Sequence, residues 1–217
     1  AVTLRAGGDV RLDGDVIAEG ATLSVSSARG AVTARVATPD GDAAEADAAL
    51  SAGADPLNSI VRVTAAGSIT LGAVVAARGI ELSSSEGDVT LQSRLGGATT
   101  GYDSYALGYQ AGLRPNVGTL SIDAPRGSVE LNGLNLDGHA DPLAPTPALG
   151  VRAGRRILSN DMIAVNKGDI ELRAGNEAGD GIFLGHSILS RGWDSTGSDR
   201  ARGGSGDGAD TRLGYAI

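Results

Sequence analysis

The sequence contains no cysteine, a single lysine and very few aromatic residues. Without cysteine, the chain can form neither a disulfide scaffold nor a thiolate metal site. One Phe, one Trp and four Tyr make up 3% of the 217 residues. Because a globular core of this length usually contains large aromatic side chains, we expect a core built from thin layers of Val, Ile, Leu and Ala instead.

The chain also lacks a positive charge balance and a long apolar run. Its net charge is −8 and its pI is about 4.7, which argues against nucleic acid as a partner. No segment approaches the roughly 20 apolar residues of a membrane-spanning helix, so no membrane span is expected. Hydrophobic residues nevertheless reach 41%, which is too many for a disordered chain.

Glycine is abundant, with 34 residues, but it shows no every-third-residue spacing, which excludes collagen. Many glycines open one short phrase, in which a small or polar residue, an apolar residue, any residue and a second apolar residue follow. Six full copies occur, at Gly8–Leu12, Gly67–Leu71, Gly87–Leu91, Gly118–Ile122, Gly127–Leu131 and Gly168–Leu172. Alternating apolar and polar residues predict short strands with one buried face.

Each phrase predicts which side chains point inward. In the copies around residues 69–91 the inward residues are Ile69, Leu71, Ile80, Leu82, Val89 and Leu91, and Thr90 faces outward. The leading glycine is expected to make a tight bend with positive φ. Strands this short need neighbours stacked at about 4.8 Å to be stable.

The spacing of the phrases separates two all-β folds. Strands recur every 8 to 12 residues, and a complete unit returns after 20 residues, from Gly67 to Gly87. An antiparallel sandwich has similar strand spacing. The very short strands favour a parallel β-helix, or β-solenoid, with coils of about 20 residues.

Residues 1–217 are expected to be a single solenoid segment of a longer chain, with loop insertions near 38–58, 94–117 and 132–148. The first insertion contains five acidic residues and no basic one, and Asp42 to Glu45 resembles a capping box that opens a short helix ending at Gly53. A solenoid tolerates insertions at its turns because the coils on either side continue to stack.

The phrases Gly67–Leu71, Gly79–Leu82 and Gly87–Leu91 resemble the repeats of filamentous-haemagglutinin-like proteins, the exoproteins of bacterial two-partner secretion. The resemblance covers most of the chain outside the insertions, but the Asn-Pro-Asn-Gly-type motif of the family's export domain is missing. It therefore concerns the repetitive shaft. It implies a right-handed parallel β-helix, a secreted or cell-surface location, and a rod that displays binding loops.

Tyr102, Tyr105 and Tyr109 are the strongest candidates for recognition. Spaced by three and four residues, they would share one face of a short helix. Exposed tyrosines suit contacts with a glycan or a protein, whereas the alternative is that they pack onto the flank of the solenoid. Phe183 and Trp193 are expected to cover an end or a seam of the rod.

Metal and cofactor sites are not predicted. The acids Asp40, Asp42, Glu45 and Asp47 and the Gly/Asp-rich run 203–210 have an irregular spacing that matches no calcium loop, so a solvated helix end and a flexible loop explain them better. His139 and His186 are the only histidines, and neither lies in a zinc or serine-hydrolase motif.

Two functions of different classes remain. The favoured one is a non-enzymatic rod, adhesin or filament segment whose shafts associate end to end or laterally. The alternative is a carbohydrate-active β-helix enzyme, a polysaccharide lyase or hydrolase. That alternative requires a carboxylate pair about 5 to 9 Å apart, and Glu81, Glu130 and Glu171 occupy outward strand positions from which they could form a row.

Overall fold

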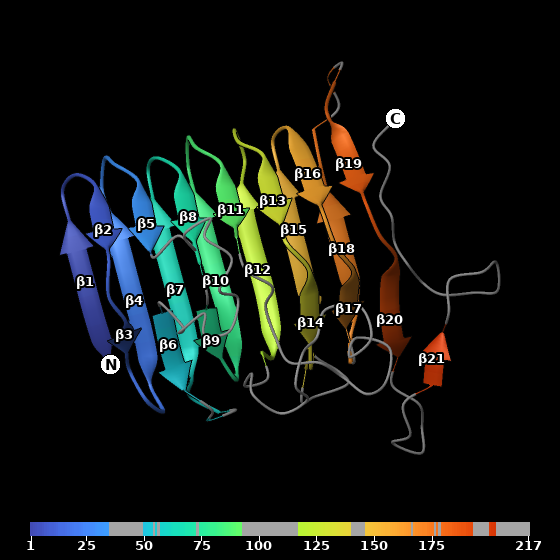
Figure 1. Cartoon of the computed structure of the whole chain (residues 1–217), viewed down its shortest axis with the longest axis horizontal. Coiled ribbons are helices and arrows are strands. Elements are labelled where there is room, and N and C mark those ends of the chain that lie inside the picture. Colours follow the sequence, from blue (N-terminus) through green and yellow to red (C-terminus); the bar gives the residue numbers. More distant parts are fainter. Residues whose placement is uncertain are drawn as a thin grey trace, which may run out of the picture.

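The computed structural model describes residues 1–34, 50–53, 55, 57–72, 74–92, 117–139, 146–165, 167–175, 177, 179–192 and 200–202. All regular structure in this part of the chain is β-strand. No helix found there is long and apolar enough to cross a membrane. The strands stack into a parallel β-helix, which confirms the predicted fold (Figure 1).

The shaft has three faces, and successive strands of each face belong to successive coils. The first face contains β1 (Val2–Ala6), β4 (Thr22–Ser27), β7 (Ile60–Ala65), β10 (Gly79–Ser84), β12 (Thr119–Ala124), β15 (Leu149–Ala153) and β18 (Ile170–Arg173). The second contains β2 (Val10–Leu12), β5 (Val32–Ala34), β8 (Ile69–Leu71), β11 (Val89–Leu91), β13 (Val129–Leu131), β16 (Arg156–Ser159) and β19 (Gly181–Leu184). We number the coils 1 to 7 in this order.

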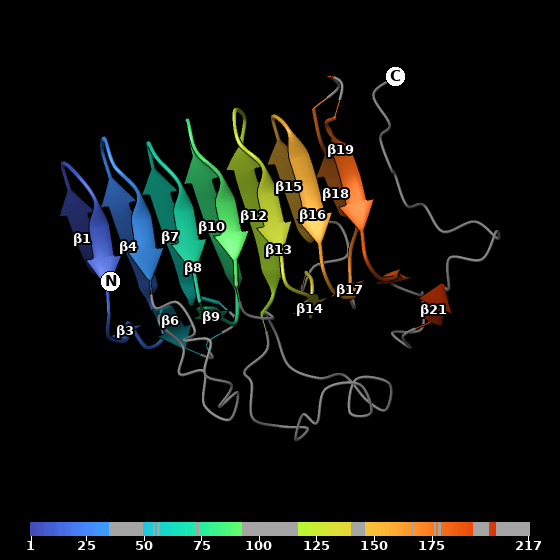
Figure 2. The same ribbon diagram turned by 45° about the horizontal axis from the view of Figure 1, so that its top comes forward.

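The third face is made of two shorter sheets. One contains β3 (Val16–Ile17), β6 (Leu50–Gly53) and β9 (Val74–Ala76), and the other contains β14 (Leu134–Leu136), β17 (Ile163–Val165), β20 (Ile188–Gly192) and β21 (Arg200–Arg202). Every pairing is parallel except that of β20 with β21. In Figure 2 the second face lies in front with its strands running down the page. The first face runs up behind it while the coils advance from left to right, which is right-handed winding.

The inward side chains form ladders along the shaft. Val89 pairs directly with Ile69, as the 20-residue period predicts, and with Val129 on its other side. All six residues that the phrases placed inward are at most 2% exposed. One ladder on the first face consists entirely of aliphatic side chains: Leu4, Val25, Val63, Leu82, Ile122, Val151 and Leu172. The buried core contains no aromatic side chain among the described residues, so coil-to-coil aliphatic contact is its main source of stability.

The glycine that opens the phrase serves a different purpose from the one predicted. Of the six glycines that open full copies, only Gly168 has a positive φ, at 113°. Four of the others, Gly67, Gly87, Gly118 and Gly127, are needed because neighbouring coils approach closely at the corners, whereas Gly8 lies in the first coil and a Cβ there would meet no atom within 4 Å. A Cβ on Gly87 would lie 2.6 Å from the carbonyl carbon of Gly67, and one on Gly127 would lie 2.5 Å from the carbonyl carbon of Gly87. Each of these four glycines therefore makes room for the backbone of the preceding coil.

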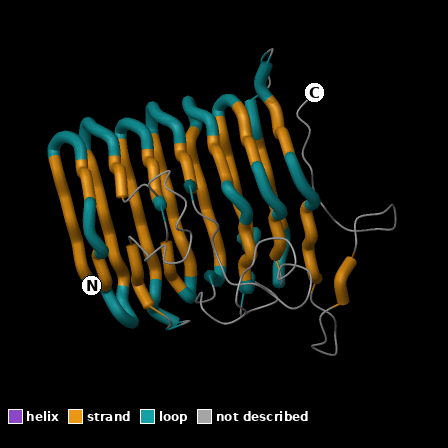
Figure 3. The backbone as a smooth tube through the Cα atoms, in the orientation of Figure 1, coloured by secondary structure: helices purple, strands orange, loops and turns teal. Residues whose placement is uncertain are grey.

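The polar residue that follows this glycine binds the next coil. Asp9 Oδ1 accepts a hydrogen bond of 2.8 Å from the backbone N–H of Ala31, and Asp88 Oδ1 accepts one of 2.7 Å from Ser128. Ser68 Oγ accepts a bond of 3.2 Å from the N–H of Asp88. Corner N–H groups lie outside the regular strand ladders, and these side chains supply their missing acceptors. Figure 3 shows the corners as a row of short turns between strands.

Two of the predicted insertions contain shaft strands. Leu50–Gly53 forms β6 and Leu134–Leu136 forms β14, so the shaft takes up part of the ranges 38–58 and 132–148. Gly53 does not end a helix, because it closes β6 with a φ of 85°. Parallel pairing with Val16 and Val74 holds Leu50 in a strand, so the predicted helix does not extend to Gly53.

The alternation of inward and outward residues can be tested at two neighbours in β11. Leu91 is 1% exposed, whereas Thr90 points outward on the same strand. Leu91→Asn should lower the free energy of unfolding by about 3 to 5 kcal/mol, because it leaves a cavity and buries an amide. Thr90→Asn should cost about 0.5 kcal/mol or less. Denaturant melts of both variants check this, and equal losses would show that the inward face is assigned wrongly.

The steric role of the corner glycines can be tested within the phrase itself. Gly87→Ala should destabilise the shaft by about 1 to 3 kcal/mol, since the new methyl group overlaps the backbone of Ser68 and Gly67. Gly8→Ala is the matched control, because a Cβ at Gly8 meets no atom within 4 Å. The control should change stability by less than about 0.5 kcal/mol. A Gly87→Ala variant as stable as Gly8→Ala in thermal melts would contradict the close-approach explanation.

Candidate functional site

The predicted recognition residues Tyr102, Tyr105 and Tyr109 lie outside the described part of the chain. So do Trp193, the acids at 40–47 and the run 203–210, which the sequence analysis considered for other roles. The shaft residues that flank the tyrosine segment are described. The description stops at Gln92, directly after β11, and resumes at Val117, which bridges to Leu136 of the third face.

The two histidines have no partners that indicate catalysis. His139 Nε2 lies 2.7 Å from the carbonyl oxygen of Thr146, which fits a ring N–H that donates to the far end of the 140–145 segment. His186 is exposed between β19 and β20. Within the described ranges, no group of three His, Asp or Glu residues is arranged to hold a metal ion.

The three outward glutamates do not come together. Glu81 and Glu171 lie in one row of the first face, but Ser121 and Gly150 separate them. Three strand spacings correspond to about 14 Å, which exceeds the separation of a glycosidase pair. Glu130 lies on the second face, where it accepts a hydrogen bond of 3.0 Å from Asn160.

Two of these glutamates form surface ion pairs. Glu81 binds Arg62 at 2.7 Å, and the hydrogen bond and charge of Glu81 raise the pKa of Arg62 above its usual value. Glu171 pairs with Arg173. Both pairs are largely exposed, so they add little stability and act mainly as outward polar cover for the sheet.

A hollow of about 490 Å³ opens at the corner between the first and second faces, across coils 5 to 7. Coil 6 turns this corner with residues 154–155 alone, whereas coil 5 has residues 125–128 and coil 7 has residues 174–180 between the same two faces. The turn of coil 6 is therefore shorter than the turns on either side, and the surface is recessed at this point. Position 154 in this turn requires glycine, because a Cβ there would overlap the backbone of Pro125.

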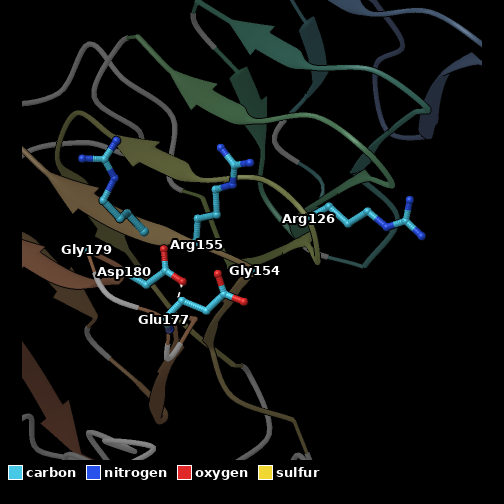
Figure 4. A pocket seen from close by; sticks show the side chains of 7 residues that line it. Arg126, Gly154, Arg155, Glu177, Gly179 and Asp180 are labelled. Carbon is cyan, nitrogen blue, oxygen red and sulfur yellow. Dashed lines mark hydrogen bonds between the residues drawn. The ribbon is translucent and has the colours of Figure 1, made fainter.

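Arginines and carboxylates line this corner hollow: Arg126, Gly154, Arg155, Arg156, Glu177, Gly179 and Asp180. Figure 4 shows Arg155, Glu177 and Asp180 around its centre, with Arg126 directed away from them. Arg126 is already paired, with its Nη1 2.5 Å from Glu86. The exposed guanidinium groups of Arg155 and Arg156 have no hydrogen-bond or ion-pair partner within the part of the chain that the structure describes.

The acidic side of the corner hollow is held by its own loop. The backbone N–H of Glu177 donates to Asp180 Oδ2 at 3.2 Å, and the N–H of Asp180 donates to the carbonyl of Glu177 at 3.0 Å. Asp180 Oδ2 also lies over Gly175, where a Cβ would come within 2.5 Å of it. Arg155 and Arg156, which have no partner among the described residues, thus line the same hollow as this acidic turn.

Our sequence analysis missed this hollow. The signal that could have found it is an irregularity, because Gly154-Arg155-Arg156 occupies a corner where other coils have the glycine phrase. A second signal is the wide gap between the apolar Leu172 and Ile182. Neither signal shows that these segments meet, because that depends on how the coils stack.

Comparison of the chain with protein-family models, with curated proteins and with solved structures finds no match. Functional interpretation therefore depends on the geometry of the shaft and of its corners.

Proposed function

We propose that this chain is a non-enzymatic shaft of a secreted or cell-surface β-helical exoprotein, and that it acts as a rod that presents recognition loops. One observation carries the proposal. Segment 35–49 follows the last residue of β5 in the sequence, and segment 93–116 begins one residue after the end of β11; both strands belong to the second face. The described chain therefore stops at the same corner of the helix in both places.

The register brings their starting points close together. Ala34 pairs with Leu71, and Leu71 pairs with Leu91, so the ends of β5 and β11 are two strand spacings apart, or about 10 Å. One segment carries the acids at 40–47 and the other carries the three tyrosines. A rod that bears acidic and tyrosine-rich loops at one corner has the chemistry to bind a glycan or a protein surface.

The shaft suits such a role because its strands and core are regular. Parallel coils make stability a sum of neighbour contacts, so loops can grow at a corner without loss of the core. The resemblance of the glycine phrase to filamentous-haemagglutinin-like repeats supports an exported location. End-to-end or lateral association of shafts stays a prediction.

Replacement of Tyr102, Tyr105 and Tyr109 by Ser tests the loop. The triple variant should bind at least about tenfold more weakly to a printed glycan array or protein ligand that the original chain recognises, since tyrosines often dominate such contacts. The matched control replaces the outward shaft residues Thr33, Thr70 and Thr90 by Ser and should bind normally. Retained binding by the tyrosine variant, or no binding by the original chain, would contradict the proposal.

The non-enzymatic part of the proposal has its own test. Incubation of the chain with acidic polysaccharides should release no new reducing ends, because Glu81, Glu130 and Glu171 do not form a carboxylate pair. Cleavage that is lost in Glu130→Gln or Glu171→Gln would instead establish the carbohydrate-active alternative.

A further inference from the structure

The corner hollow contains two arginines that have no carboxylate partner among the described residues, although the protein is acidic. Arg155 and Arg156 are adjacent in sequence, exposed, and without a carboxylate within 4.0 Å among the described residues, although the whole chain carries a net charge of −8. Arginine has a planar fork of N–H donors that matches a carboxylate in a bidentate way. The two guanidinium groups therefore offer a place for an anionic group from outside the chain.

An exposed aromatic ring borders the same corner. Phe183 is the only phenylalanine in the chain, and it is 47% exposed on the last described strand of the second face. Its ring lies over Gly181, whose Cβ position would be 3.7 Å from Phe183 Cε2. Gly181 pairs with Arg156 across the coils, so the ring lies beside the strand position that is paired with Arg156. A flat apolar face beside hydrogen-bonding groups is suited to the apolar face of a sugar ring.

The opposite side of the corner hollow supplies acceptors. The exposed carboxylate of Glu177 has no partner among the described residues, and Asp180 retains acceptor capacity beyond the one bond from the Glu177 N–H. Carboxylates accept hydrogen bonds from hydroxyl groups, and neither carboxylate neutralises Arg155 or Arg156 by a direct ion pair. A ligand that satisfies both sides must carry an anionic group and several hydroxyls.

We propose that the corner hollow binds an acidic saccharide, with Arg155 and Arg156 on the carboxylate of a uronic acid unit. Glu177 and Asp180 accept sugar hydroxyls, and Phe183 packs against a ring face. The volume of about 490 Å³ lies within the usual range of small-ligand sites. None of the residues of this site belongs to segments 35–49 and 93–116, so the tests of this proposal are independent of the test of the rod function.

Titration calorimetry with tetragalacturonate and its fully methyl-esterified form tests the proposal. The ester keeps the sugar rings and their hydroxyls but loses the charges of the carboxylates, so the acid should bind at least about tenfold more tightly than the ester. Added salt should weaken binding of the acid, because the arginines are exposed. Equal binding of the two forms, or no binding of the acid at millimolar concentration, would overturn the proposal.

Charge-matched variants locate the site. The double variant Arg155→Gln with Arg156→Gln should lose at least about tenfold in affinity for tetragalacturonate. The control, Arg5→Gln with Arg29→Gln, removes two exposed arginines from coils 1 and 2 and should stay within about twofold of the original chain. Equal losses in both double variants would show non-specific attraction and overturn the assignment. Far-UV circular dichroism should show both variants folded, since all four side chains are exposed.

Phe183→Ala separates a saccharide site from a simple anion site. It should weaken tetragalacturonate binding several-fold and leave the weaker binding of inorganic sulfate unchanged, because sulfate has no ring face for the phenyl group to cover. If the variant binds tetragalacturonate as tightly as the original chain, the hollow is a simple anion site and the proposal of a saccharide site is wrong.

Discussion

The close approach of one coil's backbone to the next is the constraint on which this structure depends. Parallel strands stack at about 4.8 Å, and the corners must follow the same spacing without the freedom of a long loop. At the first corner this leaves no space for a Cβ on Gly87 or Gly127. It also leaves backbone N–H groups that need acceptors, which Asp9, Ser68 and Asp88 provide from the preceding coil. The repeating phrase therefore supplies the glycines and the polar side chains that allow successive corners to stack.

The same constraint shapes the core. Each coil encloses a narrow cross-section, and every inward side chain must pack against its equivalents above and below. Leu, Ile, Val and Ala satisfy this repeat, as the ladder through Val63, Leu82 and Ile122 shows. The described core has no aromatic side chain, and Phe183 lies outside it with nearly half of its surface exposed. A thin aliphatic core explains why so few aromatic residues suffice for a chain of this length.

Chemistry appears where the repeat becomes irregular. The outward rows of regular coils consist of hydroxyls and paired charges such as Arg62 with Glu81. The corner hollow forms only because the short turn of coil 6 lies between longer turns. Extra residues between two strands likewise need not disturb the ladders of inward side chains. Variation of corner length is thus the means by which a uniform shaft acquires distinct surfaces.

The local pattern of the sequence was sufficient to predict the all-β class, the coil length, and the inward positions Ile69, Leu82 and Leu91, because strand alternation and period are properties of neighbouring residues. Other features depended on tertiary contact. The strands at Leu50–Gly53 and Leu134–Leu136 form because adjacent coils supply partners, and no local signal marks them. The corner glycines follow from backbone packing between coils, so their conformation could not be inferred from the phrase alone. Arg155 and Asp180 become neighbours of one hollow only when coils 6 and 7 stack, since residues 25 positions apart acquire a shared surface through the register of the helix.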